Sequence, residues 1–241
     1  MLDEIRGDGR ALLVVAAPAE ARALLRACGC DEALAERCWS RHSVRDGVDV
    51  VVTGVGKANA SAGLMRVLDT REDRVVVSCG VGGALVGSSC EIGECVVATR
   101  SVYADEGIET EDGFLSCEQM GFGYVRGGEP GSLMGVECDG RVVDALHREG
   151  DHRGGVATVS TCAGTDALAR GVVERTGAIA EAMEGASVGV SLANAMEADD
   201  RTWRVRFGEF RAISNTTGDR SWQEWDLEGA LRVLGERVAC M

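Results

Sequence analysis

The 241-residue chain has little lysine, proline or histidine, and it lacks a long apolar segment. Lys57 is the only lysine, so Schiff-base chemistry would depend on that one residue. Two prolines are too few for a proline-rich linker or stalk. No apolar run approaches the ~20 residues that span a bilayer, and residues 1–10 are acidic and polar, unlike a signal peptide. We therefore expect a cytoplasmic protein that does not enter membranes.

Positive charge is also scarce, and the formal net charge is −14. So acidic a chain repels phosphate backbones, and we therefore expect no nucleic-acid partner. The ten cysteines are scattered, without a C-x-x-C pair and with only three histidines beside them. This spacing fits neither a zinc site nor the disulfide scaffold of a short secreted protein. We expect no metal site.

Short apolar runs alternate with helical patterns along the chain. The runs are mostly continuous and end near glycine, which indicates strands buried on both faces and helices on both sides of a sheet. We predict strands over residues 11–17, 48–53, 74–79, 94–99, 156–160 and 210–214. We predict helices over residues 19–28, 58–68, 141–148, 166–176, 183–196 and 222–238.

This alternation predicts an α/β layer fold. We expect one domain over residues 1–241, with residues 1–10 as a flexible polar tail. The Gly-rich, polar region 106–139 shows weak periodicity, and we expect loops there, in a variable excursion near the site.

Two Gly-rich loops follow predicted strands, at residues 53–57 (TGVGK) and 78–83 (SCGVGG). Glycine lets a backbone approach a ligand closely, and a helix that begins there presents free N–H groups. Neither loop has the spacing of a dinucleotide fingerprint or of a Walker loop. Taken alone, both loops are better explained as ordinary tight turns between strand and helix.

Three polar side chains lie where a ligand site is commonly built. Glu20 falls in the first turn of a predicted helix, Glu184 begins a helix of small residues, and Asn215 follows a buried strand. Each has a structural alternative, because acids favour first helical turns and asparagine favours turns. A carboxylate beside a ribose diol, and an amide beside a 6-oxopurine edge, would satisfy the hydrogen-bonding needs of both partners.

Four segments, taken in order, resemble the nucleoside phosphorylase and nucleoside hydrolase superfamily. They are residues 53–60 (TGVGKANA), 78–84 (SCGVGGA), 182–186 (AMEGA) and 211–215 (RAISN). The resemblance runs from about residue 12 to residue 238. It implies a three-layer α/β/α fold with a mixed central sheet, and a homo-oligomer that is a dimer or larger.

The resemblance also implies roles for single residues. Glu20 matches the residue that activates the attacking water, Glu184 matches the carboxylate that holds the ribose 2′- and 3′-hydroxyls, and Met183 matches a sugar contact. Asn215 stands where adenine-specific nucleosidases carry an aspartate that protonates the base, and an amide cannot do this. Asp219 is a reserve candidate for that proton. The further substrate-binding residues that we expect are Gly80, Val81, Gly82, Val159, Ser160, Thr161 and Ser214.

Three details are similar to the futalosine hydrolase family within this superfamily. They are residues 16–20 (AAPAE), 158–165 (TVSTCAGT) and 214–220 (SNTTGDR) followed by 225–227 (WDL). The similarity implies hydrolysis of the N-ribosidic bond of futalosine, with release of hypoxanthine, in the futalosine pathway of menaquinone biosynthesis. It implies neither a metal nor an organic cofactor. Arg220, Arg100 and Lys57 are candidates to bind the substrate carboxylate.

Three other functions stay open at this point. One is another purine nucleosidase, of the methylthioadenosine/S-adenosylhomocysteine or the aminofutalosine type. The second is a purine nucleoside phosphorylase, for which the Gly-rich loops could hold phosphate. The third is a non-catalytic nucleoside-binding protein on the same scaffold, although binding alone would not need a water activator such as Glu20.

Overall fold

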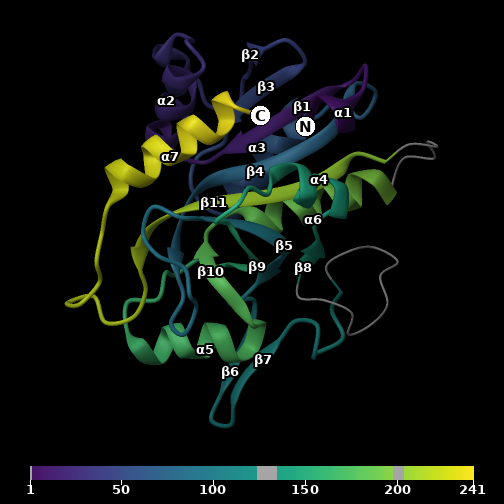
Figure 1. Ribbon diagram of the computed structural model, residues 1–241. Coiled ribbons are helices and arrows are strands. Elements are labelled where there is room, and N and C mark those ends of the chain that lie inside the picture. Colours follow the sequence, from purple (N-terminus) through teal and green to yellow (C-terminus); the bar gives the residue numbers. More distant parts are fainter. Residues whose placement is uncertain (1, 124–134, 198–203) are drawn as a thin grey trace.

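The computed structural model describes residues 2–123, 135–197 and 204–241 (Figure 1). The described strands are β1 (Arg10–Val15), β2 (Arg41–Arg45), β3 (Val48–Val52), β4 (Asp73–Ala84), β5 (Cys95–Tyr103), β6 (Gly107–Thr110), β7 (Gly113–Ser116), β8 (Gly135–Glu137), β9 (His152–Thr158), β10 (Ala178–Ala182) and β11 (Arg206–Thr216). The described helices are α1 (Leu2–Arg6), α2 (Pro18–Ala27), the 3-10 helix η1 (Glu32–Glu36), α3 (Lys57–Val67), α4 (Gly140–Leu146), α5 (Asp166–Thr176), α6 (Gly185–Glu197) and α7 (Leu227–Ala239).

The central sheet is mixed and bends back on itself. Its strand order is β10-β9-β5-β11-β4-β1-β3-β2, and β8 pairs with β5. Strands β3, β1, β4 and β11 are parallel to one another, whereas β11 and β5 are antiparallel. Strand β10 pairs with β9 and also with the last residues of β4, so five strands form a closed path. The predicted mixed sheet is confirmed.

Helices cover both faces of this sheet, which confirms the predicted three layers (Figure 1). At Gly208 of β11 a side chain would meet Val142 of α4, whereas the adjacent Phe207 packs at Gly189 of α6. Helices α4 and α6 therefore lie on opposite faces of β11. Helix α7 packs against α2, and α3 packs against α6.

The six predicted strands are present, and their burial explains why continuous apolar runs mark them. All five residues of β3 are buried, as are all but the first residue of β1. Burial on both faces removes the polar alternation of a half-exposed strand. Four short strands, β2, β6, β7 and β8, and the small-residue strand β10 were not predicted.

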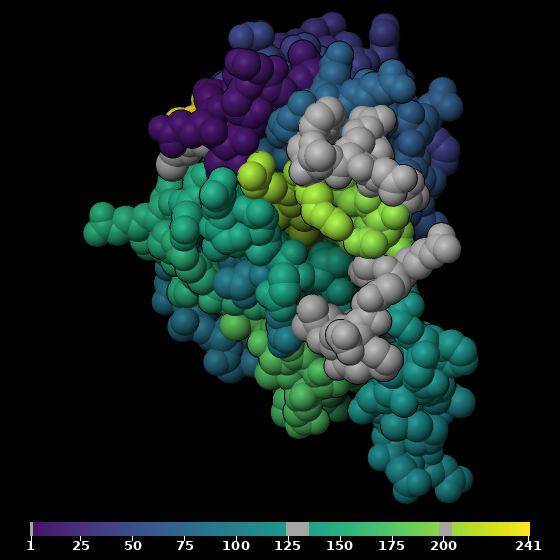
Figure 2. Space-filling model, turned by 90° about the vertical axis from the view of Figure 1, so that its right-hand side faces the viewer, coloured from purple at the N-terminus to yellow at the C-terminus, as the bar shows by residue number. Residues whose placement is uncertain are grey.

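Three predictions about chain segments need correction. Residues 2–10 are not a flexible tail, because α1 packs on the sheet with Leu2 fully buried. Helix α7 begins at Leu227, five residues after the predicted start, because Asp226 caps it by accepting from the Gly229 N–H. The region 106–139 contains the hairpin β6–β7, which projects from the body in Figure 2, and it includes residues 124–134, which lie outside the described residues.

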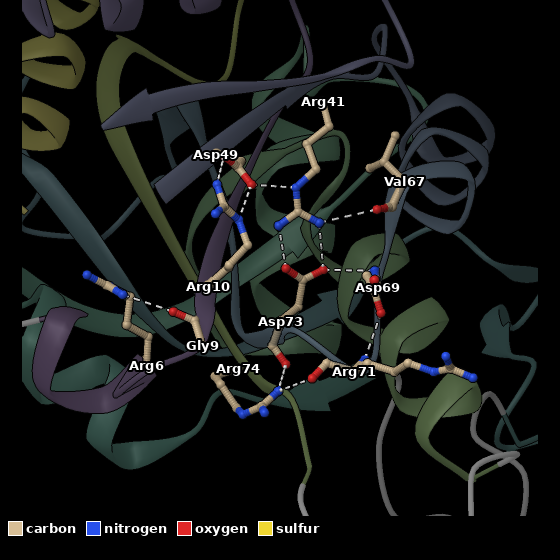
Figure 3. Close-up of polar contacts among 10 residues, drawn as sticks. All are labelled: Arg6, Gly9, Arg10, Arg41, Asp49, Val67, Asp69, Arg71, Asp73 and Arg74. Atoms are coloured by element: carbon tan, nitrogen blue, oxygen red, sulfur yellow. Dashed lines mark hydrogen bonds and ion pairs between the residues drawn. The ribbon is translucent and has the colours of Figure 1, made fainter. Parts of the chain in front are cut away.

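Charged residues join the amino ends of the central strands (Figure 3). Arg10 of β1 donates to Asp49 of β3 at 2.7 Å, and Arg41 of β2 pairs with both Asp49 and Asp73 of β4. Asp73 is fully buried and also accepts from the Asp69 N–H at 2.9 Å. These ion pairs lie at the end of the strands opposite to their carboxyl ends.

Within the described residues, no helix has the length and apolar character of a membrane span.

Candidate active site

A cavity of about 430 Å³ lies past the carboxyl ends of β1, β4 and β11, where the ends of β9 and β10 complete its walls. Its volume is within the usual range of small-molecule sites. The lining residues considered below are Glu20, Val81, Gly82, Gly83, Cys162, Glu181, Met183, Glu184, Ser214, Asn215, Arg220, Gln223 and Trp225. Glu20, Glu184 and Asn215, predicted from distant parts of the sequence, thus share one cavity.

Glu20 is held by backbone N–H groups from two strand ends. Pro18 begins α2, which puts Glu20 in the first turn of that helix. Its Oε2 accepts from the N–H groups of Ala17 at 2.8 Å and Ala16 at 3.2 Å. Its Oε1 accepts from the Val81 N–H at 2.8 Å. These contacts fix the carboxylate between β1 and β4.

Arg211 provides the positive charge at the centre of the site. This side chain is 1% exposed, and its Nε donates to Glu209 at 2.8 Å while Nη2 donates to the Ser78 hydroxyl at 2.8 Å. Its Nη1 lies 3.5 Å from Oε2 of Glu184. Burial alone would lower the pKa of Arg211, but Glu209, Glu184 and Glu20 outweigh it and raise that pKa. The guanidinium is therefore charged at every accessible pH, and it compensates three buried carboxylates.

The electrostatics at Glu20 favour a base. Burial is the largest influence and raises the pKa of Glu20, and the negative charge of Glu184 adds to this. The Ala17 and Val81 N–H groups and Arg211 oppose the increase. A carboxylate whose pKa is raised accepts a proton from water more readily.

Glu184 joins the first Gly-rich loop to the site. It lies between β10 and α6, is buried, and accepts from the Gly56 N–H at 3.0 Å through Oε1. Its own carbonyl accepts from the N–H groups of Ser187 and Val188 in the first turn of α6. The Gly-rich loop before α3 thus uses the N–H group of Gly56 to bind the Glu184 carboxylate.

Gly80 lies behind the site and does not line the cavity, although it was predicted to bind substrate. A Cβ at this position would lie 2.4 Å from Oε1 of Glu20 and 2.8 Å from Nη1 of Arg211. Only glycine leaves room for both side chains. The neighbouring Val81 and Gly82, also predicted, do line the cavity.

Asn215 enters the cavity after an irregularity in β11. The register of β11 with β4 shifts between Ile213 and Asn215, and such a bulge redirects side chains. The Asn215 Nδ2 donates to the Thr216 carbonyl at 2.8 Å, and its Oδ1 accepts from the Ser214 hydroxyl at 2.9 Å. These bonds orient the amide. A Cβ at Gly83 would lie 3.0 Å from Nδ2, so this glycine leaves the amide room.

Three of the predicted substrate contacts lie outside the cavity. Val159 is buried in a small apolar cluster, and Ser160 and Thr161 direct their backbone N–H groups to Asp105. The next residues, 162–164, line the cavity instead. The cavity wall therefore includes this loop, but not the three residues of it that were predicted to contact substrate. Met183 and Ser214 line the cavity as predicted.

Sequence reasoning missed a third acid in the cavity, Glu181 of β10. It is 4% exposed, and one backbone donor, the Ala163 N–H, lies 3.0 Å from its Oε1 and 3.3 Å from its Oε2. Burial raises the pKa of Glu181, the Ala163 N–H opposes this, and the negative charge of Asp105 adds to it. The available signal was an acid inside a run of alanines, which is unusual for a buried strand.

The rim of the cavity is formed by the segment before α7. The Arg220 guanidinium lies 4.8 Å from the centre of the Trp225 ring, and its Nη1 donates to Gln223 at 2.7 Å. The Gln223 amide donates to the carbonyls of Ala163 and Gly218, which fixes the segment to the loop after β9. A cation stacked on an exposed indole is thus present at the mouth of the cavity.

Comparison with known proteins agrees with this fold and site. The profile of the phosphorylase superfamily matches residues 10–239, nearly the whole chain, which defines the class of protein. The futalosine hydrolase of Streptomyces coelicolor is 37% identical over 82% of this chain and 79% of its own, and that of Acidothermus cellulolyticus is 34% identical over 95% and 89%. The chain belongs to the phosphorylase superfamily and, within it, to the futalosine hydrolase family.

Solved structures agree at the level of the fold. The futalosine hydrolase of Helicobacter pylori superposes with a TM-score of 0.66 over 97% of this chain and 95% of its own, at 18% identity. The 5′-methylthioadenosine/S-adenosylhomocysteine nucleosidase of Streptococcus pneumoniae gives a TM-score of 0.65 at 17% identity, over 96% and 95% of the two chains.

Proposed function

We propose that this protein hydrolyses the N-ribosidic bond of futalosine and releases hypoxanthine. The observation that carries the proposal is the convergence of Glu20, Glu184 and Asn215 on one cavity, in a chain of the futalosine hydrolase family. The substrate class is a purine nucleoside, and the chain's own side chains supply the chemistry described below.

Glu20 is the base that activates water. Its carboxylate is fixed by three N–H donors, so it needs little reorganisation when it takes a proton. Breaking of the bond between sugar and base builds positive charge on the ribose. Water adds to the anomeric carbon as Glu20 accepts its proton.

Glu184 binds the ribose diol and stabilises the positive charge of the sugar. It is anchored by the Gly56 N–H and by Arg211, which leaves its remaining lone pairs for two hydroxyls. A carboxylate near a developing cation stabilises the transition state more than the bound nucleoside. Met183 lies on the same wall of the cavity and packs against the sugar.

Asn215 determines which purine the enzyme releases. Its amide both donates and accepts, which suits a 6-oxopurine, and it cannot protonate adenine as an acid would. This favours release of hypoxanthine and makes methylthioadenosine a poor substrate.

Arg220 is the cation that binds the substrate carboxylate. Lys57 is paired with Asp105 and Glu106, and Arg100 donates to the Thr176 carbonyl, whereas Arg220 lines the cavity. An aromatic carboxylate can pack beside the Trp225 ring and pair with this guanidinium.

Loss of this cation should raise KM selectively. For Arg220→Gln we expect an increase of about 5- to 50-fold for futalosine and little change for inosine, which has no carboxylate. Arg71→Gln, an exposed arginine at the opposite end of the strands (Figure 3), is the control. An equal change in KM for both nucleosides would remove Arg220 from this role.

The function itself is tested by incubation with futalosine, inosine and methylthioadenosine, each with and without phosphate, followed by identification of the free base. We expect hypoxanthine from futalosine at a rate independent of phosphate. Dependence on phosphate would indicate a phosphorylase, and adenine release from methylthioadenosine would indicate the other nucleosidase class. Zero turnover of every nucleoside would indicate a binding protein.

We further infer a homo-oligomer of the cytoplasm, in keeping with the acidic composition and the family. Light scattering of the purified protein tests the first point, and fractionation of expressing cells tests the second. A monomer at micromolar concentration, or a membrane-bound fraction, would contradict them.

A further inference from the structure

We propose that Glu181 is the acid that protonates the departing purine. The inference rests on the proposed function, because it assigns the one step of that reaction for which Asn215 is chemically unsuited.

The strand register places Glu181 opposite Asn215. Gly83 of β4 is the register partner of Glu181 in β10 and also of Asn215 in β11. Residues directly opposite one another in neighbouring strands share a face of the sheet. Because neighbouring strands lie ~4.8 Å apart, about 10 Å separates the backbones of Glu181 and Asn215. Gly83 lies between them and lines the cavity together with both, and the Asn215 amide lies over it, so Glu181 and Asn215 flank one part of the cavity wall.

This row is displaced from the water-activating end of the cavity. Glu20 contacts β4 at Val81, two residues before Gly83, a distance of roughly 7 Å along the strand. Glu20, which activates water, and the acid Glu181 thus lie beside different positions of β4.

The other ionisable groups of the described cavity wall are unsuited to this step. Glu20 and Glu184 are committed to water and to the sugar, and Arg220 keeps its proton. Partial burial, with Glu181, Glu184 and Asp105, raises the pKa of Cys162 to about 11, so this thiol is a weak acid. Asp219, the reserve candidate, is exposed, does not line the cavity and accepts from the Ser221 N–H.

The surroundings of Glu181 favour its protonated form. Among the residues that the structure describes, Asp105 after β5 and Cys162 after β9 are the ionisable groups that interact with it, and Asp105 is paired with Lys57. The Ala163 N–H is one donor and can bind one oxygen of Glu181 at a time. The other carboxyl oxygen can therefore carry the proton that the base receives. Burial and the negative charge of Asp105 raise the pKa of Glu181, and the Ala163 N–H does not cancel this effect.

The proposed step balances. As the bond between the anomeric carbon and the base nitrogen breaks, its electron pair passes to the purine, which takes the proton of Glu181. Water adds to the anomeric carbon and gives a proton to Glu20. After products leave, Glu20 returns its proton to solvent and Glu181 takes one, so the sum is nucleoside and water giving free base and free sugar.

The test compares Glu181→Gln with the unmodified enzyme on two substrates, by single-turnover rates of base release. One is futalosine, and the other is futalosine methylated at N7, whose base leaves as a neutral molecule without protonation. We expect the variant to lose about 10²- to 10⁴-fold on futalosine and less than about tenfold on the methylated substrate. Glu174→Gln, an exposed acid on α5, is the control and should leave both rates unchanged.

Equal losses on both substrates would overturn the proposal, as would a normal rate on futalosine. A second measurement needs no variant: the single-turnover rate of the unmodified enzyme should fall as pH rises through the pKa of Glu181, and a rate with no alkaline decrease would also overturn it. If the unmodified enzyme released no base from futalosine, the proposed function would fail instead.

Discussion

At the scale of single residues, the site depends on how one buried guanidinium is shared. Arg211 contacts Glu184 and Glu209 directly and lies near Glu20, so removing any one partner changes the balance of the others. Buried charges are tolerated only when they are paired and hydrogen-bonded. The chain meets this condition with Ser78 and with backbone N–H groups, which keep the carboxylates in place before substrate arrives.

Removal of the water-activating carboxylate of Glu20 should strongly slow hydrolysis and leave the affinity for the purine product nearly unchanged. For Glu20→Gln we expect kcat to fall about 10²- to 10⁴-fold, because an amide cannot take a proton from water. The affinity for hypoxanthine, measured by calorimetry, should change less than about threefold. Glu36→Gln, an exposed acid of η1, is the control. A kcat close to that of the unmodified enzyme would exclude Glu20 as the base.

Conversion of the selecting amide into an acid should change which purine is preferred. Asn215→Asp introduces a group that can protonate a 6-aminopurine, so the ratio of kcat/KM for aminofutalosine to that for futalosine should rise at least about tenfold. Asn194→Asp on α6, away from the cavity, should leave the ratio unchanged. If Asn215→Asp also left it unchanged, base selection would lie elsewhere in the cavity.

At the scale of elements, the two ends of the sheet have different tasks. The carboxyl ends of β1, β4 and β11 carry the cavity, whereas their amino ends carry the ion pairs of Arg10, Arg41, Asp49 and Asp73 (Figure 3). These ion pairs connect β1, β2 and β3 to the start of β4. Burial would raise the pKa of Asp49, but Arg10 and Arg41 outweigh it and hold that pKa below its usual value.

Loss of one of these carboxylates should lower stability without touching the chemistry. Asp73→Asn leaves Arg41 with a single acidic partner in a buried position, and we expect about 2–4 kcal/mol less free energy of unfolding in urea. Asp144→Asn, which removes an exposed pair with Arg153, should cost less than about 1 kcal/mol. A loss from Asp73→Asn no larger than this control would mean that the network contributes little.

At the scale of the whole molecule, the net charge of −14 and the buried acids both make the folded protein more stable as pH falls toward the acidic range. Burial is the largest influence on Glu20, Glu181 and Glu209, and it raises the pKa of each. A carboxyl with a raised folded-state pKa adds stability that is complete below its unfolded pKa of 4.5 and is lost as pH rises through the folded value. Falling pH also reduces the repulsion among surface acids.

We therefore expect the Tm of the protein to rise as pH falls from 8 to about 5.5. Below about pH 4 the trend should reverse, because the unfolded chain then takes up a proton at Asp49 that the folded chain, with the lowered pKa of this carboxyl, does not take up until a lower pH. Calorimetry across this range measures both limbs, and Glu181→Gln should show a shallower rise than the unmodified protein. A Tm that falls between pH 8 and 6 would contradict the expectation.

The amino-acid sequence by itself determined six of the described strands and six of the described helices, because apolar runs and helix starts are local properties of neighbouring residues. It also determined Glu20, Glu184 and Asn215 as site candidates, since each lies in a short motif at the end of a strand. Only the tertiary structure decided that these three meet in one cavity around Arg211, that Ser160 and Thr161 do not line this cavity, and that Glu181 does. The physical reason is that β10 reaches β4 only when the sheet bends back, and strand pairing over such long separations leaves no local pattern in the chain.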